Sequence, residues 1–169
     1  VSLFNNITPL HPYLKSHKFK ILYSGNIGAK QNWDFFYRFI NELKIIDNVE
    51  VIIVGEGAEK EKVVSSLEQF TFVKHFNLVP FEDLPVLLSS ADLHILFQKT
   101  DVIDTVMPSK LLGMMASGKP SIVTGNMNSE VATVLKDSVG GNYFDGTSVK
   151  EIVDCLRIYK EDRKLCELT

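Results

Sequence analysis

Cysteine is scarce in this chain, and long apolar runs are absent from it. Of its 169 residues only Cys155 and Cys166 are cysteines, and neither has a histidine close by in the sequence. This spacing argues against a zinc site and against a disulfide, and it fits a reducing compartment. No apolar run reaches the roughly 18 residues that a membrane-spanning helix needs. We therefore expect a cytoplasmic protein.

An excess of one charge is also missing. Lysine and arginine number 18 against 21 acidic residues, which gives a net charge of −3. Such a balance provides no general attraction for nucleic acid or for an anionic membrane, so we expect no nucleic-acid partner. Any phosphate group must then be held by a few local side chains and backbone groups. The hydrophobic fraction of 45% is ordinary for a globular domain of this size.

Three common motifs are absent. The sequence contains no Gly-x-x-x-x-Gly-Lys-Ser/Thr loop, which argues against an ATPase. The glycine loops Gly25–Gly28 and Gly55–Gly57 do not complete Gly-x-Gly-x-x-Gly, and Lys60 stands where the third glycine would be. The incomplete motif argues against an oxidoreductase that binds a dinucleotide. No Ser-His-Asp or paired-carboxylate set emerges, so a hydrolase has little support.

What the chain does have is a regular alternation of short apolar runs and segments with helical periodicity. The predicted strands are Phe19–Ser24, Asn48–Val54, Thr71–His75, Leu93–Phe97, Ser121–Thr124 and Gly140–Phe144. The predicted helices are Gln31–Lys44, Ala58–Phe70, Phe81–Ser90, one that begins at Pro108 and ends before Gly118, Asn128–Lys136 and Ser148–Lys160.

This order predicts an α/β fold: a doubly wound, Rossmann-like parallel sheet of about six strands with helices on both faces. Residues 19–169 form the predicted domain. Residues 1–18 contain the breakers Pro9 and Pro12, and we interpret them as a linker from a preceding N-terminal domain. The chain begins on Val1 and ends abruptly, so we expect it to be part of a longer protein.

The segment Pro108–Pro120 carries the strongest chemical signal. Pro108 suits a first helical turn, because its φ is fixed and it has no N–H to leave unpaired. A helix that begins just beyond a strand presents free N–H groups and the positive end of its dipole to an anion. Ser109 adds a hydroxyl and Lys110 a positive charge. We predict that a phosphate group binds here.

Four loops are expected at the same edge of the sheet: Gly25–Lys30, Gly55–Gly57, Leu78–Pro80 and Gln98–Lys110, which leads into this helix. In a doubly wound sheet, ligands bind beyond the carboxyl ends of the strands. Lys30 and Lys110 could then pair with a diphosphate held between two loops, with Asn26 as a hydrogen-bond donor.

Four segments in order also resemble a known family: Tyr23–Gln31, Ile53–Gly57, Ala91–Leu93 and Pro108–Pro120. They are similar to the C-terminal half of family 4 glycosyltransferases, especially the colanic-acid-type exopolysaccharide transferases. The resemblance extends from Ile7 to about Lys160. It implies one half of a GT-B fold, in which this half binds a UDP- or GDP-sugar and a missing N-terminal half binds a polysaccharide or glycolipid acceptor.

The resemblance further implies transfer with retention of anomeric configuration, no metal or other cofactor, and possible peripheral membrane association of the full-length protein. It assigns Lys30 and Asn26 to stabilisation of the leaving diphosphate. The donor-binding residues that it implies are Gly25, Gly28, Gly55, Gly57, Leu78, Val79, Pro108, Ser109, Lys110 and Leu111.

One departure from the family pattern leaves alternatives open. Thr105 and Gly113 stand where many relatives carry two glutamates that contact the transferred sugar and the ribose. Asp101 and Asp104 lie nearby but in the wrong register. This favours, as an alternative, a non-catalytic interaction or regulatory module that kept the fold. Lys110 as an ordinary solvated helix lysine also stays open at this point.

Other residues are expected to have structural roles. We expect Glu56 to pair with Lys60 across one helical turn. Trp33 is expected to pack at the start of the first helix, and Asp92 to serve a turn or cap. His75 and His94 lie in or beside apolar runs and are expected to be structural as well.

Overall fold

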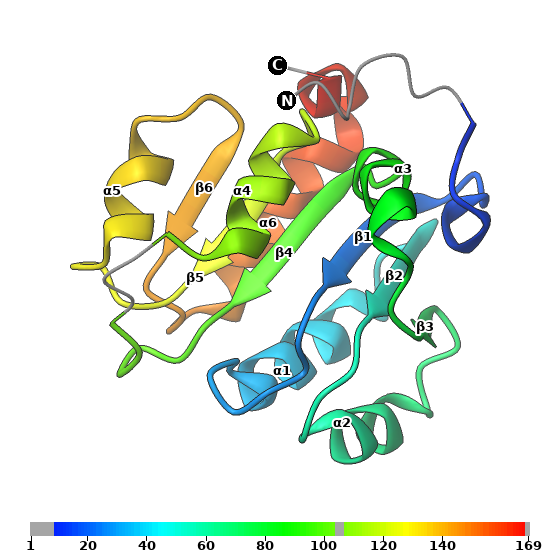
Figure 1. Cartoon of the computed structure of the whole chain (residues 1–169), viewed down its shortest axis with the longest axis horizontal. Coiled ribbons are helices and arrows are strands. Elements are labelled where there is room, and N and C mark those ends of the chain that lie inside the picture. Colours follow the sequence, from blue (N-terminus) through cyan, green and yellow to red (C-terminus); the bar gives the residue numbers. More distant parts are fainter. Residues whose placement is uncertain (1–8, 104–106, 168–169) are drawn as a thin grey trace.

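The computed structural model describes residues 9–103 and 107–167, which form a single layered unit around one sheet (Figure 1). The strands are β1 (Phe19–Ser24), β2 (Val49–Val54), β3 (Val73–Phe76), β4 (Leu93–Phe97), β5 (Ser121–Thr124) and β6 (Gly141–Phe144). The α-helices are α1 (Trp33–Leu43), α2 (Lys60–Leu67), α3 (Leu84–Ser89), α4 (Ser109–Ala116), α5 (Glu130–Lys136) and α6 (Val149–Glu161).

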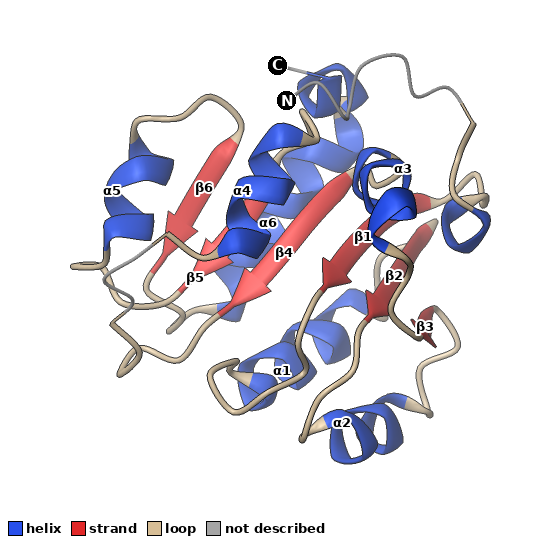
Figure 2. Cartoon of the chain, viewed as in Figure 1, coloured by secondary structure: helices blue, strands red, loops and turns tan. Residues whose placement is uncertain are grey.

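The six strands are parallel and lie in the order β3-β2-β1-β4-β5-β6. The chain builds the sheet outward from β1 to β3, then returns to the other side of β1 and builds outward from β4 to β6. Helices α1, α2 and α6 cover one face, and α3, α4 and α5 cover the other, with the strands between them (Figure 2). The predicted fold class is confirmed.

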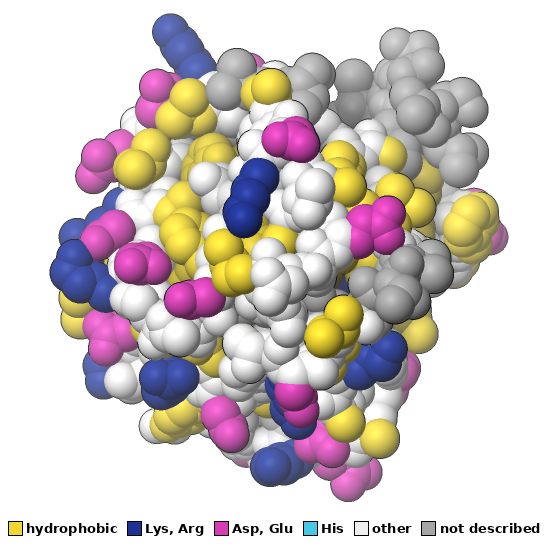
Figure 3. All heavy atoms as spheres, turned by 90° about the vertical axis from the view of Figure 1, so that its left-hand side faces the viewer, with side chains coloured by type: hydrophobic (Ala, Val, Ile, Leu, Met, Phe, Trp, Pro, Cys, Tyr) yellow, Lys and Arg dark blue, Asp and Glu magenta, His cyan; other side chains and the backbone are white. Residues whose placement is uncertain are grey.

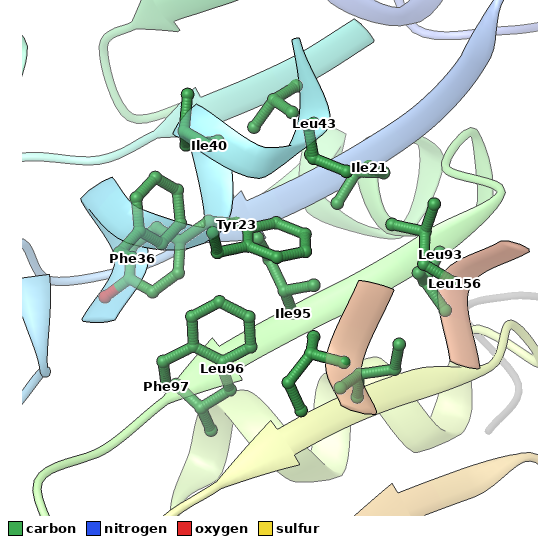
Figure 4. Packing of buried hydrophobic residues seen from close by; sticks show 14 of the residues in the cluster. Ile21, Tyr23, Phe36, Ile40, Leu43, Leu93, Ile95, Leu96, Phe97 and Leu156 are labelled. Carbon is green, nitrogen blue, oxygen red and sulfur yellow. The ribbon is translucent and has the colours of Figure 1, made fainter. Parts of the chain in front are cut away.

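The central strands are buried on both faces, which explains their near-continuous apolar sequences. Successive side chains of β1 enter different hydrophobic clusters, Ile21 and Tyr23 on the side of α1 and Leu22 on the side of α3. Figure 4 shows Tyr23 in the first cluster, with Phe36 of α1 and Phe97 of β4 nearby.

Capping side chains set the true starts of two helices. The side-chain oxygen of Asn32 accepts the Phe35 N–H, and that of Ser129 accepts the Ala132 N–H. Each residue therefore sits just outside its helix as an N-cap. For this reason α1 begins after the predicted Gln31, and α5 after the predicted Asn128.

The predicted helix Phe81–Ser90 is divided into a 3₁₀ turn, Phe81–Asp83, and α3. The reason is Pro85, which lacks an N–H and is tolerated only in the first turn of an α-helix. Pro108, predicted inside its helix, instead precedes α4 as its N-cap with an extended ψ of 132°. Its carbonyl accepts the N–H groups of Leu111 and Leu112.

Helix α2 is also shorter than the predicted Ala58–Phe70. Its first turn is delayed because residues 57–59 pair with the first glycine loop, where the Glu59 N–H donates to the Ile27 carbonyl. The strand that follows α2, β3, also begins later than predicted, at Val73 rather than at Thr71. Here the Val73 N–H donates to the Phe70 carbonyl, so residues 70–73 form a turn.

The described part of the predicted linker packs along the domain. Pro12–Leu14 form a short 3₁₀ turn, and Leu14 is fully buried beside Leu22 of β1. The His11 N–H donates to Ser90 Oγ at 2.8 Å. A further 3₁₀ segment, Arg163–Glu167, follows α6 and was not predicted. Among the helices described, none combines the length and apolarity needed to cross a bilayer.

Candidate functional site

The sheet reverses its direction of growth between β1 and β4, and the candidate site lies at their carboxyl ends. The loop after β1 leads to α1 on one face, whereas the loop after β4 leads to α4 on the other. The two connections diverge and leave a crevice between them, which is where doubly wound sheets bind ligands. Gly25–Lys30 and the amino end of α4, predicted as the two sides of a phosphate site, therefore face each other.

A chain of two hydrogen bonds links these two sides. Lys110 Nζ donates to the hydroxyl of Tyr23 at 3.1 Å, and that hydroxyl donates to the Asn26 carbonyl at 2.6 Å. The ammonium also lies over the Tyr23 ring, 5.0 Å from its centroid. Burial lowers the pKa of Lys110 to about 8. Lys110 is thus held against the first loop, and the interpretation of it as a freely solvated lysine is wrong.

Tyr23 is fixed by aromatic packing. Its ring meets Trp33 and Phe36 edge-on, with centroids 5.2 and 6.3 Å away. Trp33 in turn donates from Nε1 to the Gly28 carbonyl at 3.0 Å, which confirms its predicted packing at the start of the first helix. The aromatic cluster under α1 therefore sets the conformation of the loop that follows β1.

Two glycines allow the loops to approach. Gly25 has a φ of +142°, and a Cβ there would lie 2.7 Å from Lys110 Cε. A Cβ on Gly55 would lie only 2.0 Å from the Gly25 carbonyl oxygen. Any side chain at Gly55 would push the two backbones apart. A hydrogen bond from the Ile27 N–H to the Glu56 carbonyl stabilises this close approach.

The crevice contains two pockets on either side of Lys110. The larger has a volume of about 620 Å³, within the range typical of small-molecule sites. Its walls are mainly apolar and include Phe81, which is exposed. The residues that line it are Ser24, Gly25, Asn26, Val54, Leu78, Val79, Phe81, Leu84, Pro85, Leu88, Ser109, Lys110 and Gly113.

The smaller pocket, of about 250 Å³, is polar. It shares Asn26, Ser109 and Lys110 with the larger pocket, so the two meet at the link between the loops. Its lining residues are Asn26, Gly28, Lys30, Gln31, Gln98, Pro108, Ser109 and Lys110. An apolar and a polar compartment joined beside an ammonium group suit a ligand with an apolar ring at one end and polar groups at the other.

Helix α4 points its amino end into this junction. An α-helix leaves its first N–H groups without partners inside the helix, and its dipole is positive there. Ser109 and Lys110 are the first two residues of α4, and both line both pockets. The site thus offers backbone donors, a hydroxyl and an ammonium group to an anion.

Most of the predicted site residues come together here, and three do not line either pocket. Gly55 and Gly57 support the first loop from behind: a Cβ on Gly57 would lie 2.3 Å from the Ile27 carbonyl oxygen. Leu111 is fully buried in the core, and its N–H donates to the Pro108 carbonyl. Asp104 and Thr105 lie outside the described residues. Gly113 lines the larger pocket.

Sequence reasoning missed several residues of the site. Tyr23 belongs to a buried strand, so the pattern marks it as core and not as a link between loops. Gln31 and Gln98 are buried residues of the polar pocket that pair across an isolated antiparallel bridge. Only the pairing of these loops, which no local pattern encodes, brings the two glutamines together.

The residues expected to be structural are so placed. Lys60 Nζ lies 2.8 Å from Glu56 Oε2, and Asp92 Oδ2 accepts the Lys20 N–H at 2.8 Å. His75 Nε2 lies 2.9 Å from the Gly55 carbonyl oxygen, and His94 Nε2 lies 3.0 Å from Ser117 Oγ. Burial lowers the pKa of His94 to about 4.

Among the described residues are two free cysteines and, on one face, charges of both signs. Cys155 and Cys166 are both free thiols. Within residues 9–103 and 107–167 no cluster of side chains suited to a metal ion occurs. On the face shown in Figure 3, basic and acidic side chains are interspersed among apolar ones. This face therefore offers no broad basic surface.

Comparisons with known proteins show similarity to one sequence family, to one curated relative and to several solved structures. The sequence model described as "Glycosyl transferases group 1" matches residues 12–168. The putative colanic acid biosynthesis glycosyl transferase WcaI of Escherichia coli K12 is 31% identical over 129 residues. That match covers 75% of this chain and 31% of WcaI, so the chain spans about a third of the relative's length.

Solved structures share the fold at low sequence identity. The C-terminal domain of the group 1 glycosyl transferase LpcC from Francisella tularensis superposes with a TM-score of 0.69 at 18% identity, over 88% of this chain and 78% of that one. Anabaena HepE, solved with UDP-glucose, gives 0.68 at 16% identity over 89% and 41%. Staphylococcus aureus TarM, in a complex that includes UDP, gives 0.74 at 13% identity over 96% and 33%.

Proposed function

The chain belongs to the group 1 glycosyl transferases, and from this membership we propose that it is the donor-binding half of a retaining, metal-independent enzyme that uses a UDP- or GDP-sugar. The observation that carries the proposal is the link from Lys110 through Tyr23 to Asn26, which joins the two sides of the crevice. A diphosphate seated at this link would lie between an ammonium group and the amino end of α4.

The two pockets divide the donor between them. We assign the nucleoside to the larger pocket, whose apolar walls suit a flat base, and the sugar to the smaller polar pocket. The diphosphate then bridges the two at Ser109 and Lys110. In transfer, the bond between the anomeric carbon and the diphosphate oxygen breaks and its electron pair stays on that oxygen. The acceptor hydroxyl oxygen bonds to the anomeric carbon on the face that the diphosphate leaves, and its proton passes to the departing diphosphate oxygen.

The negative charge that develops on the leaving diphosphate sets the role of the surrounding groups. Lys30, which lines the polar pocket, and the Asn26 side chain are proposed to stabilise this charge together with the first N–H groups of α4. Donors arranged before the reaction need no reorganisation during it, and the loss of one typically lowers the rate by about 10²- to 10³-fold.

The acceptor is proposed to bind a preceding N-terminal domain that completes the cleft. A polysaccharide or glycolipid acceptor fits the likeness to the colanic acid transferase, and it would bring the full-length protein to the inner face of a membrane. On this proposal, residues 9–18 are the described end of the connection to that domain.

Calorimetric titration of the chain with UDP, GDP and ADP tests the proposal. We expect one nucleotide to bind at a single site, with affinity in the micromolar to millimolar range. A chain that binds none of the three at millimolar concentration would not be a nucleotide-sugar-binding domain. That result would favour the alternative of a non-catalytic interaction module.

A further inference from the structure

The smaller pocket contains a buried polar side chain that a diphosphate alone does not satisfy. Gln31 lines this pocket with only 7% of its surface exposed. Its side-chain oxygen, Oε1, is shielded from solvent and has no hydrogen-bond partner in the part of the chain that the structure describes. A buried acceptor without a donor is unfavourable, because it gives up its hydrogen bonds to water without replacement.

The position of Gln31 is fixed by pairing of the two loops. Gln31 and Gln98 are partners in an antiparallel bridge. The bridge is flanked by two backbone hydrogen bonds, from the Asn32 N–H to the Phe97 carbonyl at 2.8 Å and from the Lys99 N–H to the Lys30 carbonyl at 3.0 Å. Residues opposite each other in such a pair project their side chains to the same side. Gln98, itself only 6% exposed, therefore stands beside Gln31 in the wall of the pocket.

The chemistry of the pocket indicates which ligand group forms a hydrogen bond with Gln31 Oε1. Phosphate oxygens accept hydrogen bonds, so they pair with the ammonium groups of Lys30 and Lys110 and cannot satisfy Oε1. The missing partner must carry a hydrogen. In a nucleotide-sugar, the hydrogen-bond donors next to the diphosphate are the hydroxyl groups of the sugar. A sugar hydroxyl can donate its hydrogen to Oε1.

We propose that Gln31, with Gln98 beside it, binds the hydroxyl groups of the sugar carried by the donor. This inference rests on the proposed function and identifies the groups that recognise the transferred sugar. Among the described lining residues of the polar pocket no carboxylate occurs. Recognition by neutral amides places no additional negative charge beside the diphosphate. The expected ligands are neutral hexoses, which offer hydroxyls that both donate and accept.

The test compares nucleotide-sugars with their own nucleoside diphosphates. UDP-glucose and UDP, and GDP-mannose and GDP, are titrated into the wild-type chain and into Gln31→Leu. We expect Gln31→Leu to weaken binding of the nucleotide-sugar about 3- to 10-fold, as for one lost hydrogen bond. Binding of the nucleoside diphosphate should change less than about twofold, because it does not reach Gln31.

A matched control and a stability readout separate recognition from folding. Gln69→Leu replaces an exposed glutamine that donates to the Tyr37 hydroxyl at 3.0 Å, away from both pockets, and it should leave all four affinities unchanged. Gln31→Leu should keep or raise the melting temperature, because Oε1 has no hydrogen bond to lose. A glutamine with a purely structural role would lower it.

The failures are distinguishable. If the wild-type chain binds UDP or GDP but Gln31→Leu leaves every affinity unchanged, the sugar assignment is overturned and the proposed function stands. Equal weakening of nucleotide-sugar and nucleoside diphosphate also overturns it, since Gln31 would then only shape the loop. If no nucleotide binds the wild-type chain, the proposed function fails and this inference fails with it.

Discussion

The ammonium group of Lys110 lies 3.1 Å from the hydroxyl oxygen of Tyr23, although α4 and β1 are far apart in the sequence. The Tyr23 hydroxyl in turn donates a hydrogen bond to the Asn26 carbonyl at 2.6 Å. The Tyr23 hydroxyl therefore connects the first turn of α4 with the loop after β1, which form the two sides of the crevice. A strand residue that the sequence marks only as core becomes the connection between the two halves of the proposed diphosphate site.

Tyr23→Phe tests this connection. The variant keeps the ring and its packing but removes the hydroxyl that joins Lys110 to Asn26. We expect UDP or GDP to bind about 3- to 10-fold more weakly, with a loss of unfolding free energy near 1 kcal/mol. Tyr159→Phe is the matched control, because the Tyr159 hydroxyl accepts from Asn142 outside both pockets. Equal nucleotide affinity in Tyr23→Phe and wild type would show that the link is dispensable.

Lys110→Met removes the charge at the junction of the two pockets. A hydrogen bond to a charged group contributes about 1.5–3 kcal/mol, so nucleotide binding should weaken about 10- to 100-fold. Lys62→Met, which replaces an exposed lysine on α2, should have no effect on binding. Titration calorimetry on the two variants measures the difference. Unchanged affinity in Lys110→Met would place the diphosphate elsewhere.

Nucleotide affinity should also depend on pH through Lys110. In the free protein the pKa of Lys110 is about 8, because burial disfavours its charged form. A bound diphosphate favours the charged form and raises this pKa. Binding above pH 8 therefore takes up a proton, and affinity should fall by up to about tenfold per pH unit as the pH rises from 8.

Titrations at pH 7, 8, 9 and 10 check this, with Lys110→Met as the reference. The variant lacks the titrating group, so its affinity should vary less across the series. Parallel curves for the variant and the wild type would assign the pH dependence to another group.

Gly55→Ala tests the packing of the loops behind the site. A Cβ at this position would lie 2.0 Å from the backbone oxygen of Gly25, so one of the two backbones must move. We expect a loss of about 1–3 kcal/mol in unfolding free energy and weaker nucleotide binding. Gly28→Ala is the comparison: its Cβ would meet the Asn26 side-chain nitrogen, which belongs to an exposed and movable group. If Gly55→Ala is as stable as Gly28→Ala in urea, the close approach is not needed.

Acid should destabilise the fold through His94. The pKa of this buried imidazole is about 4 in the folded chain against 6.5 in the unfolded one. Between these values only the unfolded chain takes up the proton, so stability falls as the pH drops from 6.5 to 4, by about 2–3 kcal/mol in all. Urea unfolding at pH 7 and 4.5 measures the loss. His94→Gln should reduce it, and an equal loss in both proteins would exclude His94 as the cause.

The sequence was sufficient to predict the architecture, because buried parallel strands leave an uninterrupted apolar signature. β4 and β5 have the predicted bounds, since turn residues flank both runs. The predicted first residues of helices were less accurate where a capping side chain determines the start of the helix. Asn32 and Ser129 look like helix residues in a periodic pattern, yet their side chains accept the first N–H groups and stop the helix there.

The site could be predicted only as far as topology dictates it. Parallel strands bring their carboxyl ends to one edge, and this places Asn26 and Lys110 in one crevice. The orientation of Tyr23 and the pairing of Gln31 with Gln98 depend on contacts between loops distant in sequence. For two glycines the sequence suggests a role in ligand binding that the pockets do not reflect. Gly55 and Gly57 line neither pocket, and both positions need glycine because the backbone of the first loop lies against them.

The most direct measurement is a crystal structure of the chain with its bound nucleoside diphosphate. The account predicts the two phosphates between the Gly25–Lys30 loop and the first turn of α4, within hydrogen-bond distance of Lys110 Nζ and of the Ser109 or Lys110 N–H, with the base in the larger pocket. A nucleotide bound at any other edge of the sheet, or phosphates that do not contact Lys110, would contradict it.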